Sequence, residues 1–112
     1  MSRKSDSVRL YRILELLTDA DKIVARHGTV PSTLEDTEGE YAILMILSQI
    51  GEVLGKIEDD AFVRALPVRE ATGLRNLIVH DYEGVNRRQI HLIFEHSLPE
   101  LKRAVQGLLE SP

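Results

Sequence analysis

The residues best suited to chemistry lie close together between Leu74 and Tyr82. This segment has the sequence Leu-Arg-Asn-Leu-Ile-Val-His-Asp-Tyr, in which five polar side chains surround an apolar triplet. Arginine can hold a phosphate through two parallel hydrogen bonds and stabilise the charge that develops on it. Histidine titrates near neutral pH and can move a proton to or from a ribose hydroxyl or a leaving oxygen. Arg75 and His80 are therefore a minimal, metal-independent pair for cleaving RNA, which supplies its own 2′-hydroxyl nucleophile.

The spacing of Arg75 and His80 sets a condition on this chemistry. Residues five apart on a continuous α-helix lie about 140° apart around its axis. The two side chains converge only if the helix loosens near His80, for which Gly84 offers a break, or if two copies of the chain meet at a dimer axis. A structural interpretation also stands, in which His80 caps a helix C-terminus and Tyr82 is an aromatic residue at the edge of the core.

The remaining histidines and acidic residues do not predict a second site. His27, His91 and His96 lack convergent partners in the sequence and are expected at the surface or at helix caps. His91 and His96 are five residues apart, which is not the spacing of two metal ligands on one helix face. The acidic residues of segment 29–39 lack the regular oxygen-ligand spacing of a cation site, so a solvated loop with one short helical turn is expected. No metal and no cofactor is assigned.

Apolar residues recur at intervals of three and four and predict an all-α, up-and-down bundle of four or five helices. Neither strand-length alternation nor an internal repeat is present in the sequence. Gly28 is expected to end the first helix, Asp59 or Asp60 to cap a short one, and Asn86 to cap the last. The expected helices span residues 7–27, 40–57, 67–79 and 86–108, with the short one near 60–66.

The second helix, residues 40–57, has an unusually wide apolar stripe that begins at Tyr41. Such a stripe predicts burial on two sides, against the bundle and against a partner chain. Gly51 and Gly55 lie on one face of this helix, and each costs about 1 kcal/mol of helix propensity relative to Ala. The expected compensation is the close approach of another backbone. Pro99 should kink or split the final helix near Ser97.

The composition predicts one water-soluble domain with an aliphatic core. The 112 residues include three Tyr, two Phe, no Trp and no Cys, so disulfides and thiolate metal sites are excluded. No apolar run approaches the roughly 20 residues that span a bilayer, and the first residues lead into an amphipathic helix, so the cytoplasm is the expected location. The net charge of −4 argues against generic duplex-DNA binding. A local basic cleft remains open, because five arginines lie near the motif: Arg64, Arg69, Arg75, Arg87 and Arg88.

The segment 67–86 closely resembles the HepT-like ribonuclease toxins of the HEPN superfamily. The mark of this family is Arg, a polar residue that is often Asn, three further residues, His, any residue, and Tyr. Arg75, Asn76, His80 and Tyr82 match that pattern. The extended motif is specific, whereas Arg and His at this spacing alone would not be.

The resemblance extends over nearly the whole chain. Residues 50–53 resemble the Ile-Gly-Glu-Ala segment common on the preceding helix of the family, and residues 98–101 resemble its kinked final helix. Val68 departs from the pattern, since many relatives have Trp there. The resemblance implies a single HepT-like (HEPN) domain over residues 1–112, which forms a homodimer with two Arg/His pairs lining a cleft at the interface.

The resemblance also implies a function, which is that of the toxin in a type VII-like toxin–antitoxin system. The toxin would be a metal-independent endoribonuclease acting on tRNA or mRNA, in which Arg75 stabilises the scissile phosphate and His80 is the acid/base. Asn76 would orient backbone or substrate, and Asp81 would tune His80 or simply be solvated. The implied partner is an MntA-like minimal nucleotidyltransferase antitoxin, which transfers AMP onto Tyr82 and thereby blocks the cleft.

Two other functions remain open from the sequence. The first is a non-catalytic HEPN module that binds RNA or a nucleotide, or docks a nucleotidyltransferase. The second is a helical dimerisation domain in which Arg75 and His80 are structural. Loss of RNA cleavage on substitution of His80 would separate the enzyme from both.

Overall fold

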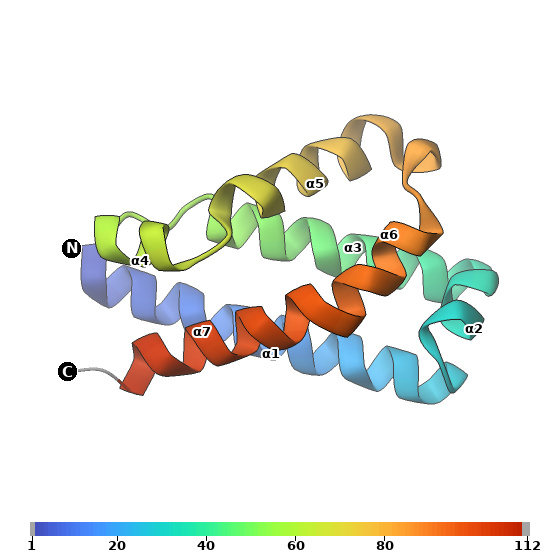
Figure 1. Ribbon diagram of the computed structural model, residues 1–112, viewed down its shortest axis with the longest axis horizontal. Coiled ribbons are helices and arrows are strands. Elements are labelled where there is room, and N and C mark those ends of the chain that lie inside the picture. The colour runs from blue at the N-terminus through green and yellow to red at the C-terminus, as the bar shows by residue number, and fades with distance from the viewer. Residues whose placement is uncertain (1, 111–112) are drawn as a thin grey trace.

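The computed structural model describes residues 2–110, with side chains from Ser5 onward, and this part of the chain contains helices and no strand. Successive long helices run in opposite directions, and α3 lies between α1 and α5 while α7 packs on α1 (Figure 1). The predicted all-α bundle is thus confirmed. None of the described helices is both long and apolar enough to cross a membrane. The elements are α1 (Ser2–His27), α2 (Val30–Glu35), α3 (Thr37–Leu54), α4 (Asp60–Ala65), α5 (Val68–Asp81), the 3-10 helix η1 (Tyr82–Gly84), α6 (Arg87–Leu92), the π-helix η2 (Ile93–Ser97) and α7 (Leu98–Glu110).

The first helix begins earlier than predicted, at Ser2, and a buried carboxylate anchors its first turns. The Asp6 side chain is fully buried and accepts hydrogen bonds from the backbone N–H groups of Glu58, at 3.1 Å, and Asp59, at 2.8 Å. Arg9 Nη1 donates to the same carboxylate at 2.9 Å. These bonds satisfy a buried charge and hold the connection between α3 and α4 against α1. The sequence did not indicate this role, since an acidic residue near the start of an amphipathic helix is usually solvated.

The other end of α1 is joined to α3 through His27. Gly28 ends α1 with φ of 96°, as predicted. His27 Nδ1 donates to the Ile23 carbonyl at 2.8 Å, and Nε2 lies 3.2 Å from Asp36 Oδ2. Both contacts, that with Ile23 first, raise the pKa of His27. The prediction that His27 lacks a partner was therefore wrong, because Asp36 is brought beside it by the N-terminal turn of α3, where Asp36 also accepts from Gly39 N at 2.9 Å.

The crossing of α5 over α3 is set by Gly51. A Cβ atom at Gly51 would lie 2.5 Å from the Ala71 carbonyl oxygen and 2.6 Å from Arg75 Cβ. The predicted close approach of another backbone is confirmed at this glycine. Gly55 differs, because it follows the end of α3 and its nearest neighbour is the Thr72 methyl group, 3.1 Å from a Cβ built there. Gly51 therefore sets the distance between the two helices.

The final helical segment is interrupted where Pro99 predicts. Asn86 caps α6 by accepting hydrogen bonds from the N–H groups of Arg88, at 2.8 Å, and Gln89, at 3.3 Å. The π-turn η2 then shifts the hydrogen-bond register, so that the Leu98 N–H bonds to the Ile93 carbonyl. This shift lets Pro99 enter the first turn of α7, where the lack of a backbone N–H on proline removes no helical hydrogen bond. The predicted split near Ser97 is confirmed.

The first prediction concerns the helix crossing. Gly51→Ala should lower the free energy of unfolding by about 1–3 kcal/mol, because its Cβ meets backbone that cannot move without shifting α5. The matched control is Gly73→Ala, another helical glycine, whose Cβ would meet no atom within 4 Å. This control should raise stability by about 0.5–1 kcal/mol. Urea unfolding measures both, and equal effects of the two substitutions would contradict the proposed role of Gly51.

Candidate active site

The motif helix is continuous through both proposed catalytic residues. The α5 helix continues past its predicted end at Val79, through His80 to Asp81, where the backbone leaves the helix with φ of −158°. The helix therefore does not loosen before His80. Arg75 and His80 lie on one regular helix, about 140° apart around its axis. A single chain does not bring the two side chains together.

Arg75 is held in place from two directions. Its Nε lies 2.9 Å from Glu52 Oε2 on α3, and its Nη1 donates to Asn76 Oδ1 at 3.0 Å. The Arg75 side chain is 34% exposed. A guanidinium has five N–H donors, so donors remain for a phosphate after these two contacts. Asn76 thus orients Arg75, and Glu52, which follows the crossing glycine Gly51, is a site residue to which the sequence assigned no role.

His80 and Asp81 are both exposed at the end of α5. Within the described part of the chain the His80 ring makes no hydrogen bond and is not joined to Asp81. The Asp81 carboxylate instead lies against Gly84, where a Cβ would collide with it. Two roles were considered for Asp81, tuning of His80 and simple solvation, and no contact supports the tuning of His80. Asp81 borders the 3-10 helix that starts at Tyr82.

Tyr82 pairs with a second tyrosine at the start of α3. The hydroxyls of Tyr82 and Tyr41 are 3.4 Å apart, and the rings meet edge to face with centroids 6.0 Å apart. This hydrogen bond raises the pKa of Tyr82 above its ordinary value, followed by the charge interaction with Tyr41, burial, and the nearby carboxylates of Glu83 and Glu40. Tyr41 begins the wide apolar stripe predicted for this helix, and it is 54% exposed in the single chain. It lies near the N-terminus of α3, where the neighbouring segment is the short 3-10 helix η1 and not a long helix.

Two of the arginines that left a local basic cleft open are paired with carboxylates of the same chain. Arg75 is paired with Glu52, and Arg87 Nη2 lies 3.2 Å from Glu40 Oε2. The charge of these two arginines is therefore shared with carboxylates of α3.

His91 was expected to lack a partner, but its Nε2 lies 3.3 Å from Glu95 Oε1.

Exposed apolar side chains continue from the tyrosine pair along both helices. The antiparallel register that sets Tyr41 beside Tyr82, and Gly51 beside Ala71, brings Met45 of α3 level with Val79 of α5. Met45 is 60% exposed and Val79 is 55% exposed. An apolar strip therefore runs beside the motif on the solvent side of α3 and α5.

The site thus consists of Arg75, Asn76 and His80 on α5 and Tyr82 in the turn that follows, within a helical bundle. The model of the Ribonuclease HepT-like family matches residues 11–108, and the chain belongs to this family. The resemblance noted in the sequence is thus confirmed.

Three curated proteins of Methanocaldococcus jannaschii, each named as a candidate RNase, are similar to the chain over almost its full length. One is 24% identical, with 98% of this chain and 92% of the relative aligned. Two others are each 27% identical. One aligns over 95% of this chain and 98% of the relative. The other aligns over 98% of this chain and 96% of the relative. No significantly similar solved structure was found.

The second prediction concerns the tyrosine pair. Tyr41→Phe should lower the pKa of Tyr82, because it removes the largest of the causes that raise it. A pH titration followed by NMR of ring-labelled tyrosine measures the change. Tyr11→Phe is the control, since Tyr11 is exposed on α1 and should leave the Tyr82 curve unmoved. An unchanged Tyr82 curve in Tyr41→Phe would show that the hydroxyls do not interact in solution.

Proposed function

We propose that this chain is an endoribonuclease that cleaves RNA without a metal, at a site shared by two copies. The observation that carries the proposal is the orientation of the Arg75 guanidinium, which Glu52 of α3 and the neighbouring Asn76 hold in place. His80 is exposed on the same helix as Arg75. Membership of the Ribonuclease HepT-like family supports the same activity.

The reaction is a transfer within the RNA backbone. The ribose 2′-oxygen attacks the adjacent phosphorus, an O–P bond forms, and the bond from phosphorus to the 5′-oxygen breaks. His80 takes the 2′-hydroxyl proton or gives a proton to the leaving 5′-oxygen, and a second copy's histidine can perform the complementary transfer. Arg75 holds the phosphate and stabilises the negative charge of the transition state. The products are a 2′,3′-cyclic phosphate and a free 5′-hydroxyl.

The need for a second copy follows from the unbroken helix. Because Arg75 and His80 face different directions on α5, one chain presents only part of the site to a given phosphate. The exposed strip of Met45 and Val79 lies beside these residues and supplies apolar surface for a symmetric contact. Two copies joined there would bring both Arg/His pairs into one cleft.

Tyr82 is the proposed point of control. Its hydroxyl is at the end of the motif helix, and its side chain is 43% exposed, so a partner enzyme can reach it. An MntA-like minimal nucleotidyltransferase would join the Tyr82 oxygen to the α-phosphorus of ATP, with loss of the phenolic proton and release of pyrophosphate. The added phosphate and nucleoside would repel and exclude RNA from the neighbouring cleft. This is the arrangement of a toxin and its antitoxin.

A non-catalytic module that binds RNA or a nucleotide, or docks a nucleotidyltransferase, is the second candidate. The observation in its favour is the ion pair between Arg75 and Glu52, which already occupies one edge of the guanidinium. Cleavage assays with single substitutions separate the two candidates.

The third prediction tests catalysis. Arg75→Ala and His80→Ala should each lower RNA cleavage by about 100-fold or more, since one removes charge stabilisation and the other proton transfer. Purified, unmodified protein is incubated with bulk tRNA and with an mRNA transcript in the presence of EDTA. Arg103→Ala and His96→Ala, exposed residues outside the motif, are the matched controls and should cleave like wild type. Wild-type cleavage no faster than that of His80→Ala would exclude the enzyme.

The fourth prediction tests the shared site. The chain should sediment as a dimer at micromolar concentration, and Met45→Glu should yield a folded monomer that has also lost cleavage. Val8→Glu is the control, because Val8 is 67% exposed on α1, away from the motif. A wild-type monomer, or a Met45→Glu dimer with full activity, would be inconsistent with a cleft at this strip.

The fifth prediction tests control by modification. After incubation with ATP and a minimal nucleotidyltransferase of the MntA type, intact mass should show added AMP on wild type and on Tyr11→Phe, but none on Tyr82→Phe. Modified wild type should lose RNA cleavage. Addition of AMP to Tyr82→Phe would place the modification elsewhere.

A further inference from the structure

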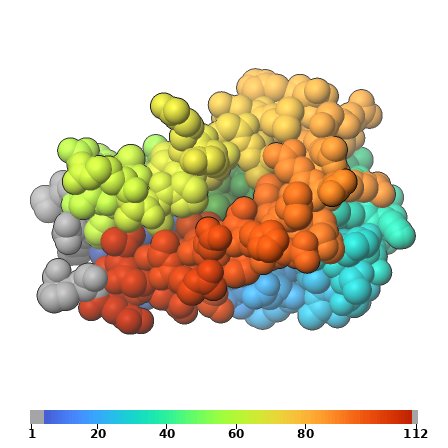
Figure 2. Space-filling model, viewed as in Figure 1, coloured from blue at the N-terminus to red at the C-terminus, as the bar shows by residue number. Residues whose placement is uncertain are grey.

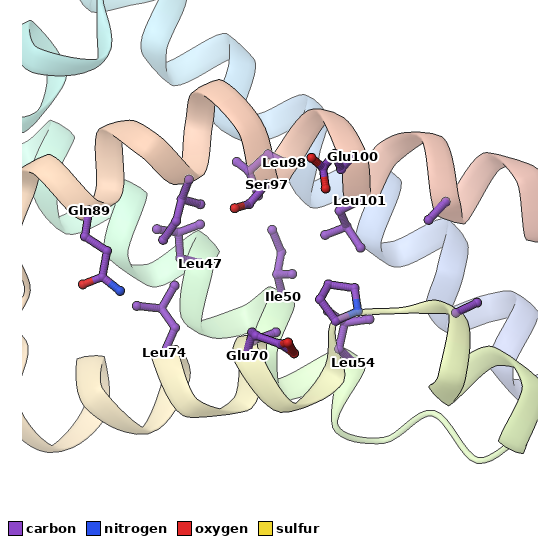
Figure 3. Close-up of a pocket in the computed structure, with 15 residues that line it drawn as sticks. Leu47, Ile50, Leu54, Glu70, Leu74, Gln89, Ser97, Leu98, Glu100 and Leu101 are labelled. Carbon is purple, nitrogen blue, oxygen red and sulfur yellow. The ribbon is translucent and has the colours of Figure 1, made fainter.

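A groove lies on the face of α5 turned away from Asn76 and Val79. It runs between α5 and the α6–η2–α7 segment, and α3 is visible at its bottom (Figure 2). The groove encloses about 510 Å³, and its floor is formed by core residues of α3, including Ile50 and Leu54 (Figure 3). The motif chemistry proposed above uses none of these residues.

The groove is the open side of the bundle. In this fold α5 packs on α3 and α7 packs on α1, which leaves space between α5 and α7. Leu74 on one wall and Leu98 on the other are only half-buried, so both present apolar surface to the opening.

The two walls each place a carboxylate at the rim. Glu70 projects from α5 and Glu100 from α7, on opposite sides of the apolar floor (Figure 3). Both side chains are exposed, and neither forms an ion pair or hydrogen bond within the described part of the chain. An apolar floor between two unpaired negative charges complements an occupant that is both apolar and positively charged, and it repels an anionic one.

We propose that this groove docks a helix of a partner protein that is apolar along one face and has Lys or Arg beside that face. The apolar face would cover Leu74 and Leu98 above the buried floor, as in other helix-in-groove complexes. The basic side chains would pair with Glu70 and Glu100. Because α5 forms one wall of the groove, an occupant would be in direct contact with the helix that holds the motif. This proposal does not depend on ribonuclease activity.

A synthetic peptide tests this proposal directly. The probe is a helical peptide of about 18 residues with Leu on one face, Lys flanking it and a single Trp among the leucines. The chain itself has no Trp, so the emission reports on the peptide alone. Addition of full-length protein should shift the emission to shorter wavelength in a saturable manner. The same peptide with Glu in place of each Lys should not bind.

Paired variants of the protein locate the binding. Glu70→Gln with Glu100→Gln should weaken binding by about fivefold, since two partly exposed ion pairs are lost. Asp19→Asn with Asp21→Asn changes the net charge equally, at two exposed positions of α1, and should leave binding unchanged. Circular dichroism confirms that both variants are folded.

Three binding results would overturn the proposal. These are no saturable shift at protein concentrations up to about 100 μM, equal binding of the Lys and Glu peptides, and equal weakening by the two paired variants. Dissociation of a protein dimer by the peptide, seen in sedimentation, would show that a second copy of the chain occupies the groove instead.

Discussion

The contact between α3 and α5 at Gly51 determines the geometry of the whole motif region. The absence of a side chain at this position lets the Ala71 carbonyl and the first carbon of the Arg75 side chain lie directly on α3. The next residue along α3 is Glu52, which can then reach Arg75 Nε. Farther along the same antiparallel register, Tyr41 meets Tyr82. One close approach of two backbones therefore brings a carboxylate to the arginine and a hydroxyl to the tyrosine.

Polar contacts at the two ends of α1 hold the helices that form this contact. The buried Asp6 carboxylate binds the N–H groups that follow α3, and His27 meets the Asp36 cap that begins α3. The start and the end of α3 are thereby tied to α1 independently of apolar packing. Such directional contacts fix the rotation and position of a helix, whereas aliphatic side chains alone tolerate sliding. The position of α3 in turn sets that of α5.

The same helix α5 separates two surfaces of different character. One side presents Arg75, Asn76 and the exposed Val79, and the proposed catalytic and dimer contacts belong there. The other side presents Leu74 and Glu70 to the groove beside α7. A helix whose main packing partner is α3 can display chemistry on one face and receive a partner on the other. Binding partners can therefore contact the motif helix on either surface.

The sequence by itself determined the helical class, the capping of the short helix by Asp59 or Asp60 and of the last by Asn86, the stop at Gly28, the interruption before Pro99 and the motif from Arg75 to Tyr82. These features depend on local backbone chemistry and on residue types within a few turns, so a linear pattern contains them. The tertiary structure alone decided that Glu52 holds Arg75, that Tyr41 is exposed beside Tyr82, and that Asp6 is buried. Each of these pairs residues 20 or more positions apart, and their meeting depends on the helix crossing and rotation, which periodicity does not specify. The tertiary structure also showed that α5 is unbroken through His80, where the sequence had left a helix break and a dimer axis as alternatives.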